Sequence, residues 1–403
     1  MKKKTKSFFI CFVLVSIFVL LLVLCGEEGD DNTENKDKTQ ISKVRSEAEE
    51  YLSGKDIEQY SNLNFECKTI NVPETDEIHS LYVYPETISQ VSPTKENISK
   101  LVEILKKIIG NDFVFENVYF YDVTESDTDK AKIVADDYER LSIYDVCPPL
   151  IYSDYDNFKE VEINMNCIYA TKGKIGKYVN AHNAFIGDED FTYVKSYICA
   201  TDDLSDKYKL LDGEKSIEEA KKEIEEYFDQ ITIIDNSDVN IKNSVVSIDV
   251  YKIPDEDIYV YHADRTFSYD NINFKVIRSG RATSSMMGNE TGIMAEAFMI
   301  ESGSVDVFLG IMNTYSKVEE KEKYIDIVSF ESAVSKVSEF LANQTVFKVK
   351  GVSIEYRLFY DKDVDYLEAV PYWLFTAENE TDKSTTYVYV DLNTGETTGN
   401  TVK

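Results

Sequence analysis

One pattern occurs twice in the second half of the chain and constrains its fold more than any other feature. Each copy begins with an amphipathic helix whose first residue suits a cap. The first begins at Ser216, and Glu219 follows at the spacing of a capping box, in which each side chain satisfies a backbone N–H. The second begins at Ser329. The apolar residues expected on one helical face are Ile217, Ala220, Ile224, Tyr227 and Phe228 in the first copy, and Phe330, Ala333, Val337, Phe340 and Leu341 in the second.

A similar strand follows each helix, with the sequence VSIDVY at residues 246–251 and VSIEYR at residues 352–357. We interpret the two copies as a duplicated helix-plus-strands unit. Two further strands are expected at 372–377 and 386–391, joined by a polar hairpin loop. After the last of these strands, Gly395 can supply the positive φ that closes a turn.

These residues resemble a known family. A helix, antiparallel strands, PYWLF at 371–375 and YVYVDLNTGE at 387–396 are similar to the C-terminal pattern of PepSY-like domains. The chain also resembles the extracytoplasmic parts of YycH/YycI-type accessory proteins, which have one N-terminal anchor and restrain a sensor kinase. The resemblance covers about residues 210–400, with repeats expected at about 213–315 and 326–400. It implies an α+β fold of antiparallel sheets packed against helices, and a non-enzymatic function.

The first half of the chain matches no family, but its periodicity predicts two helices. The first covers residues 41–52, and the second covers about 93–109 and ends before Gly110. The apolar residues expected to be buried are Ile41, Val44, Ala48 and Leu52 in the first helix, and Ile98, Leu101, Val102, Leu105, Ile108 and Ile109 in the second. We therefore expect an N-terminal α+β domain over residues 41–209 and a C-terminal α+β domain over residues 210–403.

The N-terminus has the pattern of an export signal. Lysines are concentrated in the first six residues, and an uncharged apolar run extends from Phe8 to Leu24. Positive charge before an apolar run stays on the inner side of a membrane, so the remainder of the chain is expected outside. Residues 1–25 are interpreted as a signal peptide or membrane anchor. Residues 26–40 are acidic and polar, and we expect them to form a disordered tether.

Two kinds of anchor fit this N-terminus. The residues before Cys25 resemble a bacterial lipobox, which implies lipidation of that cysteine. A small residue usually precedes the cysteine, whereas here it is Leu24, so an uncleaved membrane-spanning segment is the alternative. Both alternatives predict a protein on the extracytoplasmic face of the cell membrane, anchored through its N-terminus.

Composition narrows the choice of partners. The formal net charge is −31, which would repel phosphate backbones, so we expect no nucleic-acid partner. Four cysteines lie outside the N-terminal segment: Cys67, Cys147, Cys167 and Cys199. They can form two disulfides in three pairings or remain buried thiols, and the sequence does not decide between these alternatives.

No catalytic, cofactor or metal motif stands out, and we predict that the protein is not an enzyme and uses no cofactor. The histidines are His79, His182 and His262, and none has the spacing of a metal pair, so each is interpreted as an ordinary polar residue. The acidic runs at 202–206 and 361–365 lack the Gly and distal Glu of a calcium loop and are expected to be solvated.

The leading hypothesis is a membrane-anchored extracytoplasmic protein that acts through protein contacts on a membrane or cell-wall protein. The alternative is an extracellular module that binds a peptide, a glycan or a cation. Tyrosine-rich strands such as 259–261 and 387–389 offer a surface for such a ligand, although half-buried packing is the usual role of such residues. The small-residue segment 279–288 is interpreted as a mobile connection between strands.

Overall fold

The computed structural model describes residues 38–53, 60–67, 70–85, 92–157, 159–164, 167–172, 191–200, 202–231, 241–276, 290–293, 295–309, 315–342, 346–361 and 363–402. The described helices are α2 (Ile41–Ser53), α3 (Lys95–Ile109), α4 (Tyr138–Leu141), α5 (Ile217–Ile231) and α6 (Phe330–Phe340), with short 3₁₀ turns η2 (Gly110–Asp112), η3 (Phe115–Asn117) and η4 (Tyr155–Asn157).

The described strands of the first half are β1 (Lys38–Gln40), β2 (Leu63–Phe65), β3 (Ile78–Pro85), β4 (Val118–Tyr121), β5 (Lys132–Val134), β6 (Leu150–Asp154), β7 (Lys159–Asn164), β8 (Cys167–Lys172), β9 (Thr192–Ile198) and β10 (Lys207–Lys209). Those of the second half are β11 (Glu214–Ser216), β12 (Ile241–Lys252), β13 (Tyr259–Tyr269), β14 (Ile272–Phe274), β15 (Glu290–Thr291), β16 (Ala295–Glu301), β17 (Ser304–Leu309), β18 (Tyr315–Tyr324), β19 (Asp326–Val328), β20 (Phe347–Tyr360), β21 (Leu367–Asn379), β22 (Thr385–Asp391) and β23 (Thr397–Val402).

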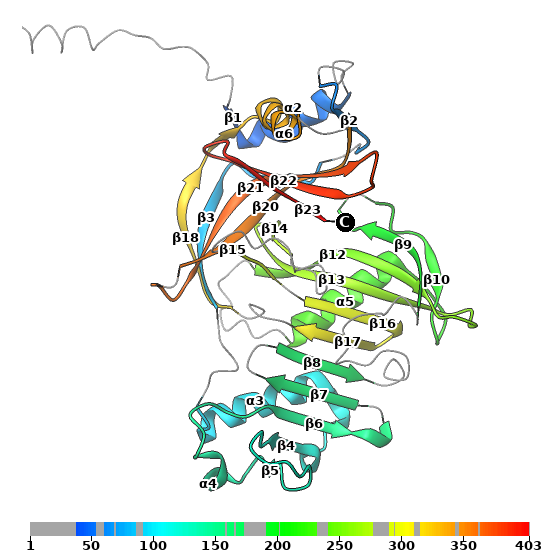
Figure 1. Cartoon of the computed structure of the whole chain (residues 1–403), viewed down its shortest axis with the longest axis vertical. Helices are drawn as coiled ribbons and strands as arrows, with labels where there is room; N and C mark the ends of the chain where they lie inside the picture. The colour runs from blue at the N-terminus through cyan, green and yellow to red at the C-terminus, as the bar shows by residue number, and fades with distance from the viewer. Residues whose placement is uncertain are drawn as a thin grey trace, which may run out of the picture. The chain divides into compact units, whose positions relative to one another are not determined.

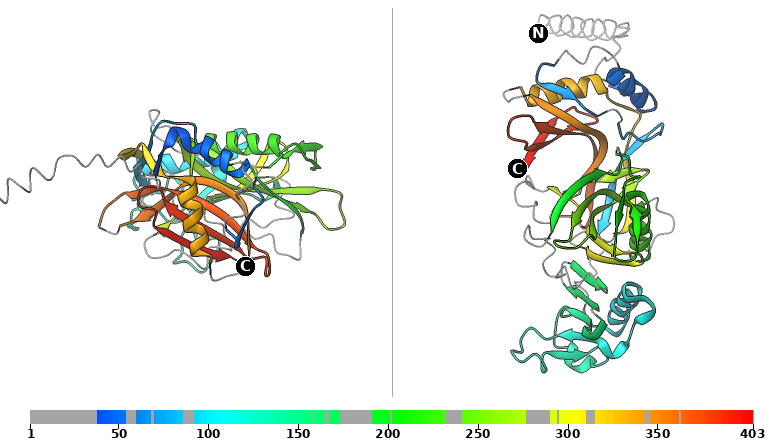
Figure 2. Two further views of the ribbon diagram at one scale, coloured as in Figure 1. Left: turned by 90° about the horizontal axis from the view of Figure 1, so that it is seen from above. Right: turned by 90° about the vertical axis from the view of Figure 1, so that its right-hand side faces the viewer.

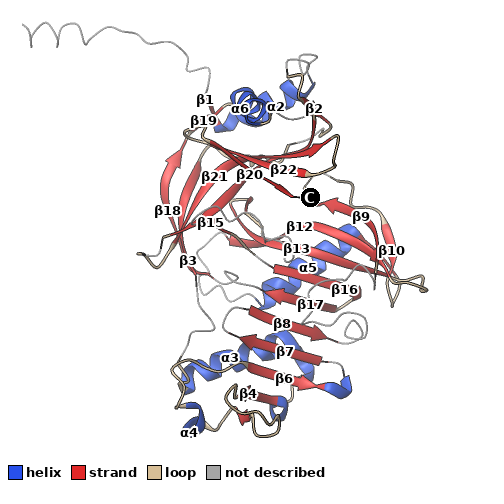
Figure 3. Ribbon diagram, viewed as in Figure 1, coloured by secondary structure: helices blue, strands red, loops and turns tan. Residues whose placement is uncertain are grey.

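The predicted α+β class is wrong, because strands dominate the described residues and only a few helices lie against them (Figure 3). Some strands of the first half pair with strands of the second half through backbone hydrogen bonds: β2 with β20, β3 with β21, β8 with β17 and β9 with β12. Strands β4 to β7 pair with strands of the first half. Pairing between the two halves depends on contacts between segments far apart in the sequence, and the hydrophobic periodicity of one segment does not predict these contacts.

The longest run of pairing is an antiparallel ladder in the order β5–β4–β6–β7–β8–β17–β16–β13–β12–β9 (Figure 1). Helices α3 and α5 lie on one face of this ladder, and the Tyr227 hydroxyl of α5 donates to the Ile108 carbonyl at 3.4 Å. A second group of strands has the order β23–β22–β21–β20, with β3 beside β21 and β18 beside β3.

The two strand groups meet through β14, which pairs with β13 on one side and in parallel with β20 on the other. Asp270 and Asn271 turn the chain from β13 into β14, and both have positive φ. Two successive residues of this kind form the primed turn that matches the twist of a hairpin. As a result, β14 stays beside β13 and reaches β20.

Helices α3, α5 and α6 are each followed by four strands that pair consecutively: β4, β6, β7 and β8; β12, β13, β16 and β17; and β20 to β23.

The predicted capping box of α5 is confirmed, since the Glu219 N–H donates to Ser216 Oγ at 3.1 Å and the Glu219 carboxylate accepts from the Ser216 N–H at 2.8 Å. Ser329 caps α6 as predicted. Phe340 was expected on the buried face but is 40% exposed.

Helix α6 lies on β22 and β23 and contacts α2, as the view from above shows (Figure 2). Phe330 at its start packs edge to face on the buried Trp373 ring, with centroids 5.6 Å apart. The Trp373 indole N–H donates to the Val328 carbonyl at 3.0 Å, which satisfies its polar atom in the core. The turn after β22 is confirmed as well, because Gly395 has a φ of +71°.

Strands on either side of the predicted boundary between residues 209 and 210 pair with one another. β9 pairs with β12, β8 pairs with β17, and β3 pairs with β18 and β21. Residues 39–403 form one compact unit by their contacts. The interfaces between the two predicted domains are therefore continuous backbone ladders.

Candidate metal centre

The candidate site lies on the face of the ladder that points away from α5. Residues of a strand alternate between the two faces of a sheet. The guanidinium of Arg265 in β13 lies 4.6 Å from the Phe228 ring of α5, so Arg265 faces the helix. Asp264 lies one residue before Arg265 and His262 lies three residues before it. Both side chains therefore face the other side of the sheet. Glu296 of β16 lies directly beside Asp264 in the register and faces the same way.

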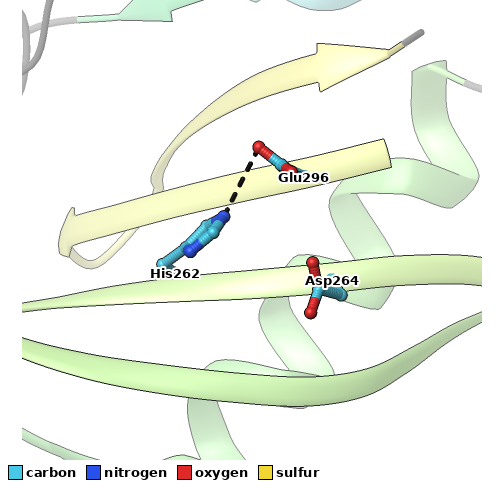
Figure 4. A group of neighbouring side chains, drawn as sticks. All are labelled: His262, Asp264 and Glu296. Atoms are coloured by element: carbon cyan, nitrogen blue, oxygen red, sulfur yellow. Dashed lines mark ion pairs between the residues drawn. The ribbon is translucent and has the colours of Figure 1, made fainter. Parts of the chain in front are cut away.

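Three potential ligand atoms converge there, one each from His262, Asp264 and Glu296, and all lie within 4.8 Å of one another. Figure 4 shows the His262 ring extending from β13 toward the Glu296 carboxylate on β16. The distance from His262 Nε2 to Glu296 Oε2 is 3.5 Å, which fits an ion pair but is long for a hydrogen bond. A cation between these atoms would contact all three side chains.

The cluster is set in a largely apolar surround. Asp264 is 3% exposed and Glu296 1% exposed, and the His262 ring stacks on Phe298 with centroids 4.6 Å apart and planes 5° apart. Phe298 belongs to a small apolar cluster that also contains Phe191, Ile253, Val260 and Ile300. The Ser247 hydroxyl donates to Asp264 Oδ2 at 2.6 Å and orients that carboxylate. An apolar shell with an orienting hydrogen bond is a common surround of metal ligands.

The local charge is negative. Asp249 of β12 lies beside His262 in the register and is also buried, which brings a third carboxylate to the same face. Burial alone would lower the pKa of His262, but its contact with Glu296 and the charges of Asp264 and Asp249 raise that pKa. The fold therefore favours positive charge at this position, and either a proton on His262 or a bound cation can provide it.

The donor set favours a transition metal ion. Imidazole and carboxylate ligands suit Zn²⁺ and similar divalent ions, whereas Ca²⁺ and Mg²⁺ prefer ligands that are all oxygen. Three protein ligands leave at least one coordination position for water or another molecule.

The other predicted positions are placed as follows. His79 lies 3.9 Å from Glu77 and 3.5 Å from Glu320, but these carboxylates are well exposed. The described residues of the 361–365 run, Asp361 and 363–365, lie between β20 and β21. Asp202 accepts from the Ile198 N–H at 2.7 Å, which matches a turn and not a calcium loop. His182, the segment 279–288 and Cys25 lie outside the described residues.

Three of the four cysteines can be assigned. Cys67, Cys147 and Cys199 are free thiols, and burial raises the pKa of the Cys67 and Cys147 thiols to about 11. Thiols with such pKa values are poor nucleophiles at neutral pH. Within the described part of the chain, no helix has the length and apolarity needed to cross a membrane.

The candidate metal cluster was missed from the sequence, where His262 was interpreted as an ordinary polar residue. One local signal was available: His262 and Asp264 alternate within a strand-like run, which places both on one face. The sequence around Glu296 gives no such indication, because only the pairing of β13 with β16 brings Glu296 close to His262 and Asp264.

Comparison with known proteins adds a fold likeness. No family model and no curated protein matches this chain. The crystal structure of an uncharacterized protein from Eubacterium rectale ATCC 33656 is similar, with a TM-score of 0.53 and 17% identity over 88% of this chain and 98% of that chain. The C-terminal domain of Bacillus megaterium YpeB aligns over 78% of this chain and 99% of that chain with 12% identity, but its TM-score of 0.31 carries no argument. At 17% identity, the first likeness shows a shared fold and nothing about activity.

Proposed function

We propose that this chain is a membrane-anchored, extracytoplasmic, non-enzymatic protein that binds a divalent transition metal ion. The single observation that carries metal binding is the convergence of His262, Asp264 and Glu296 within 4.8 Å on a buried face of the sheet. The N-terminal apolar run and Cys25 support export and anchoring. The PepSY-like assignment of residues 213–315 and 326–400 belongs to the same proposal, supported by the consecutive four-strand pairing after α5 and α6.

Metal binding is tested by calorimetric titration of the chelator-treated full-length chain with ZnCl₂, MnCl₂ and CaCl₂. We expect binding of Zn²⁺ and weaker binding of Mn²⁺, with Ca²⁺ weakest. Loss of a residue that hydrogen-bonds to a metal ligand typically costs about 10- to 100-fold in metal affinity. Removing a ligand itself, by His262→Ala or Asp264→Asn, should therefore cost about 100-fold or more. Ser247→Ala removes only the hydrogen bond to Asp264 and should cost about tenfold.

His79→Ala is the matched control, because His79 also lies near two carboxylates, but these carboxylates are well exposed. It should leave Zn²⁺ affinity unchanged. Equal Zn²⁺ affinity in the parent and in Asp264→Asn would refute the proposed site. Zn²⁺ should also raise the melting temperature of the parent, because a ligand that binds the native state stabilises it.

Anchoring is tested by metabolic palmitate labelling of the parent and of Cys25→Ala in a bacterial host. Label that disappears in the variant supports a lipoprotein. An unlabelled product that stays in the membrane fraction at full length supports the uncleaved anchor. A product found only in the medium or the cytoplasm contradicts both.

A second candidate function is contact with a neighbouring protein through β9. Among the described residues, β9 pairs only with β12, and it presents Tyr193, Val194 and Ile198 with exposures of 56%, 41% and 39%. An open strand edge with apolar side chains is a template for a partner strand. Crosslinking in intact cells should capture a membrane or cell-wall protein with the parent and not with Val194→Lys. Equal capture by both would remove β9 as the contact.

A further inference from the structure

A pocket lined by both polar and apolar side chains lies between the two groups of strands, away from the candidate metal cluster. Its volume is about 320 Å³, and none of the three candidate metal ligands lines it. One wall comes from β12 and β13, and the other from β20 and β21. Asn273 of β14 is paired with Glu355 of β20, and Asn71 bridges to Ser353. Backbone pairing therefore fixes the positions from which these polar side chains extend.

The charge inside this pocket points to a cationic ligand. Glu355 lines the pocket, is half-buried, and accepts a long hydrogen bond of 3.3 Å from the Ser353 hydroxyl. Burial raises the pKa of Glu355 to about 7, and the nearby charge of Lys275 offsets only part of that effect. Lys221 also lines the pocket, but its ammonium pairs with Glu225 at 2.6 Å. Among the described residues, the Glu355 carboxyl thus has no cationic partner at ion-pair distance.

The remaining lining sets the size and polarity of the ligand. The side chains of Asn71 and Asn273 offer both donors and acceptors to a bound molecule. None of the described residues that line the pocket is aromatic, so a sugar ring would find no stacking surface. A volume near 320 Å³ is at the lower end for ligand sites, which suits a molecule of amino-acid size. The strongly acidic chain also attracts cations to its surface.

We propose that this pocket binds a small organic cation of the size of a basic amino acid, with its ammonium or guanidinium group on Glu355. The amides of Asn71 and Asn273 would accept or donate hydrogen bonds to the rest of the ligand. This site is separate from the metal centre, and neither proposal depends on the other.

The test is calorimetric titration of the full-length, chelator-treated chain with L-arginine and L-lysine, with L-glutamate and glucose as comparison ligands. We expect saturable heat with L-arginine or L-lysine and none with the other two. Glu355→Gln has nearly the same shape and should weaken binding by about tenfold or more, the usual scale for a hydrogen-bonded charge. Asn71→Ala should weaken it as well.

The matched control is Glu396→Gln, which makes the same charge change at an exposed position outside the pocket. It should leave the affinity for L-arginine and L-lysine unchanged. The proposal is overturned if neither basic amino acid binds, if Glu355→Gln binds as tightly as the parent, or if Glu396→Gln weakens binding equally. Circular dichroism of each variant separates loss of binding from loss of folding.

Discussion

At the scale of single residues, buried charge is balanced by direct pairing at one place in the second half. Arg357 donates from Nε and Nη2 to the two oxygens of Glu290, at 2.7 and 2.9 Å. Lys275 adds a third contact to Glu290 at 2.7 Å. The Arg357 guanidinium also lies 4.7 Å from the rings of both Tyr372 and Tyr389. The Glu290 carboxylate thus has two cationic partners, whereas at the candidate metal centre three carboxylates lie near one imidazole.

Arg357→Met should destabilise the protein strongly. It leaves the buried Glu290 carboxylate with only Lys275, and breaking a buried pair typically costs about 3–5 kcal/mol. The free energy of unfolding in urea measures the loss. The double variant Glu290→Gln/Arg357→Met should recover part of it.

Lys350→Met is the control for that measurement, because its pair with Glu66 is partly exposed. A surface pair of this kind contributes about 1 kcal/mol or less. A loss in Arg357→Met no larger than in Lys350→Met would show that the Glu290 pair does not hold β15 to β20.

The pH dependence of stability should contain a contribution from Glu355. Its pKa is raised from 4.5 to about 7, so the folded state binds more protons than the unfolded state between these values. The stabilisation is complete below pH 4.5 and is lost as the pH rises through about 7. Relative to Glu355→Gln, the parent should therefore lose on the order of 2 kcal/mol between pH 4.5 and pH 8. Parallel urea-unfolding profiles of parent and variant across this range would contradict the shift.

At the scale of elements, the caps of the helices are local and separable from the sheet. Ser216→Ala removes one side of the capping box of α5 and should cost about 1 kcal/mol. Thermal unfolding followed by circular dichroism measures this loss. Ser99→Ala is the control, because Ser99 is exposed within α3 and its hydroxyl donates to the Lys95 carbonyl of the same helix. Alanine favours a helix interior, so that variant should lose no stability. Equal losses in both would show that the cap contributes nothing.

At the scale of the whole molecule, the ladder makes the second half depend on the first. A fragment of residues 210–403 lacks β9, β8 and β3, which pair with β12, β17 and β21. It would expose the edges of these strands, and we expect it to unfold without a cooperative transition or to aggregate. Residues 39–403 should show one cooperative transition by calorimetry. A fragment that melts cooperatively at the same temperature would contradict this dependence.

The sequence alone determined the features that depend on neighbours within a few residues. The buried stripe of α3, the caps at Ser216 and Ser329 and the turn at Gly395 follow from side-chain spacing and backbone preference, and each was predicted correctly. The tertiary structure alone decided the class of the fold and the arrangement of the candidate metal cluster. Both depend on which strands become neighbours, and Glu296 meets His262 only because β16 pairs with β13. Strand pairing depends on burial and hydrogen bonding across the whole sheet. The sequence of one short segment therefore does not determine which strand will pair with it.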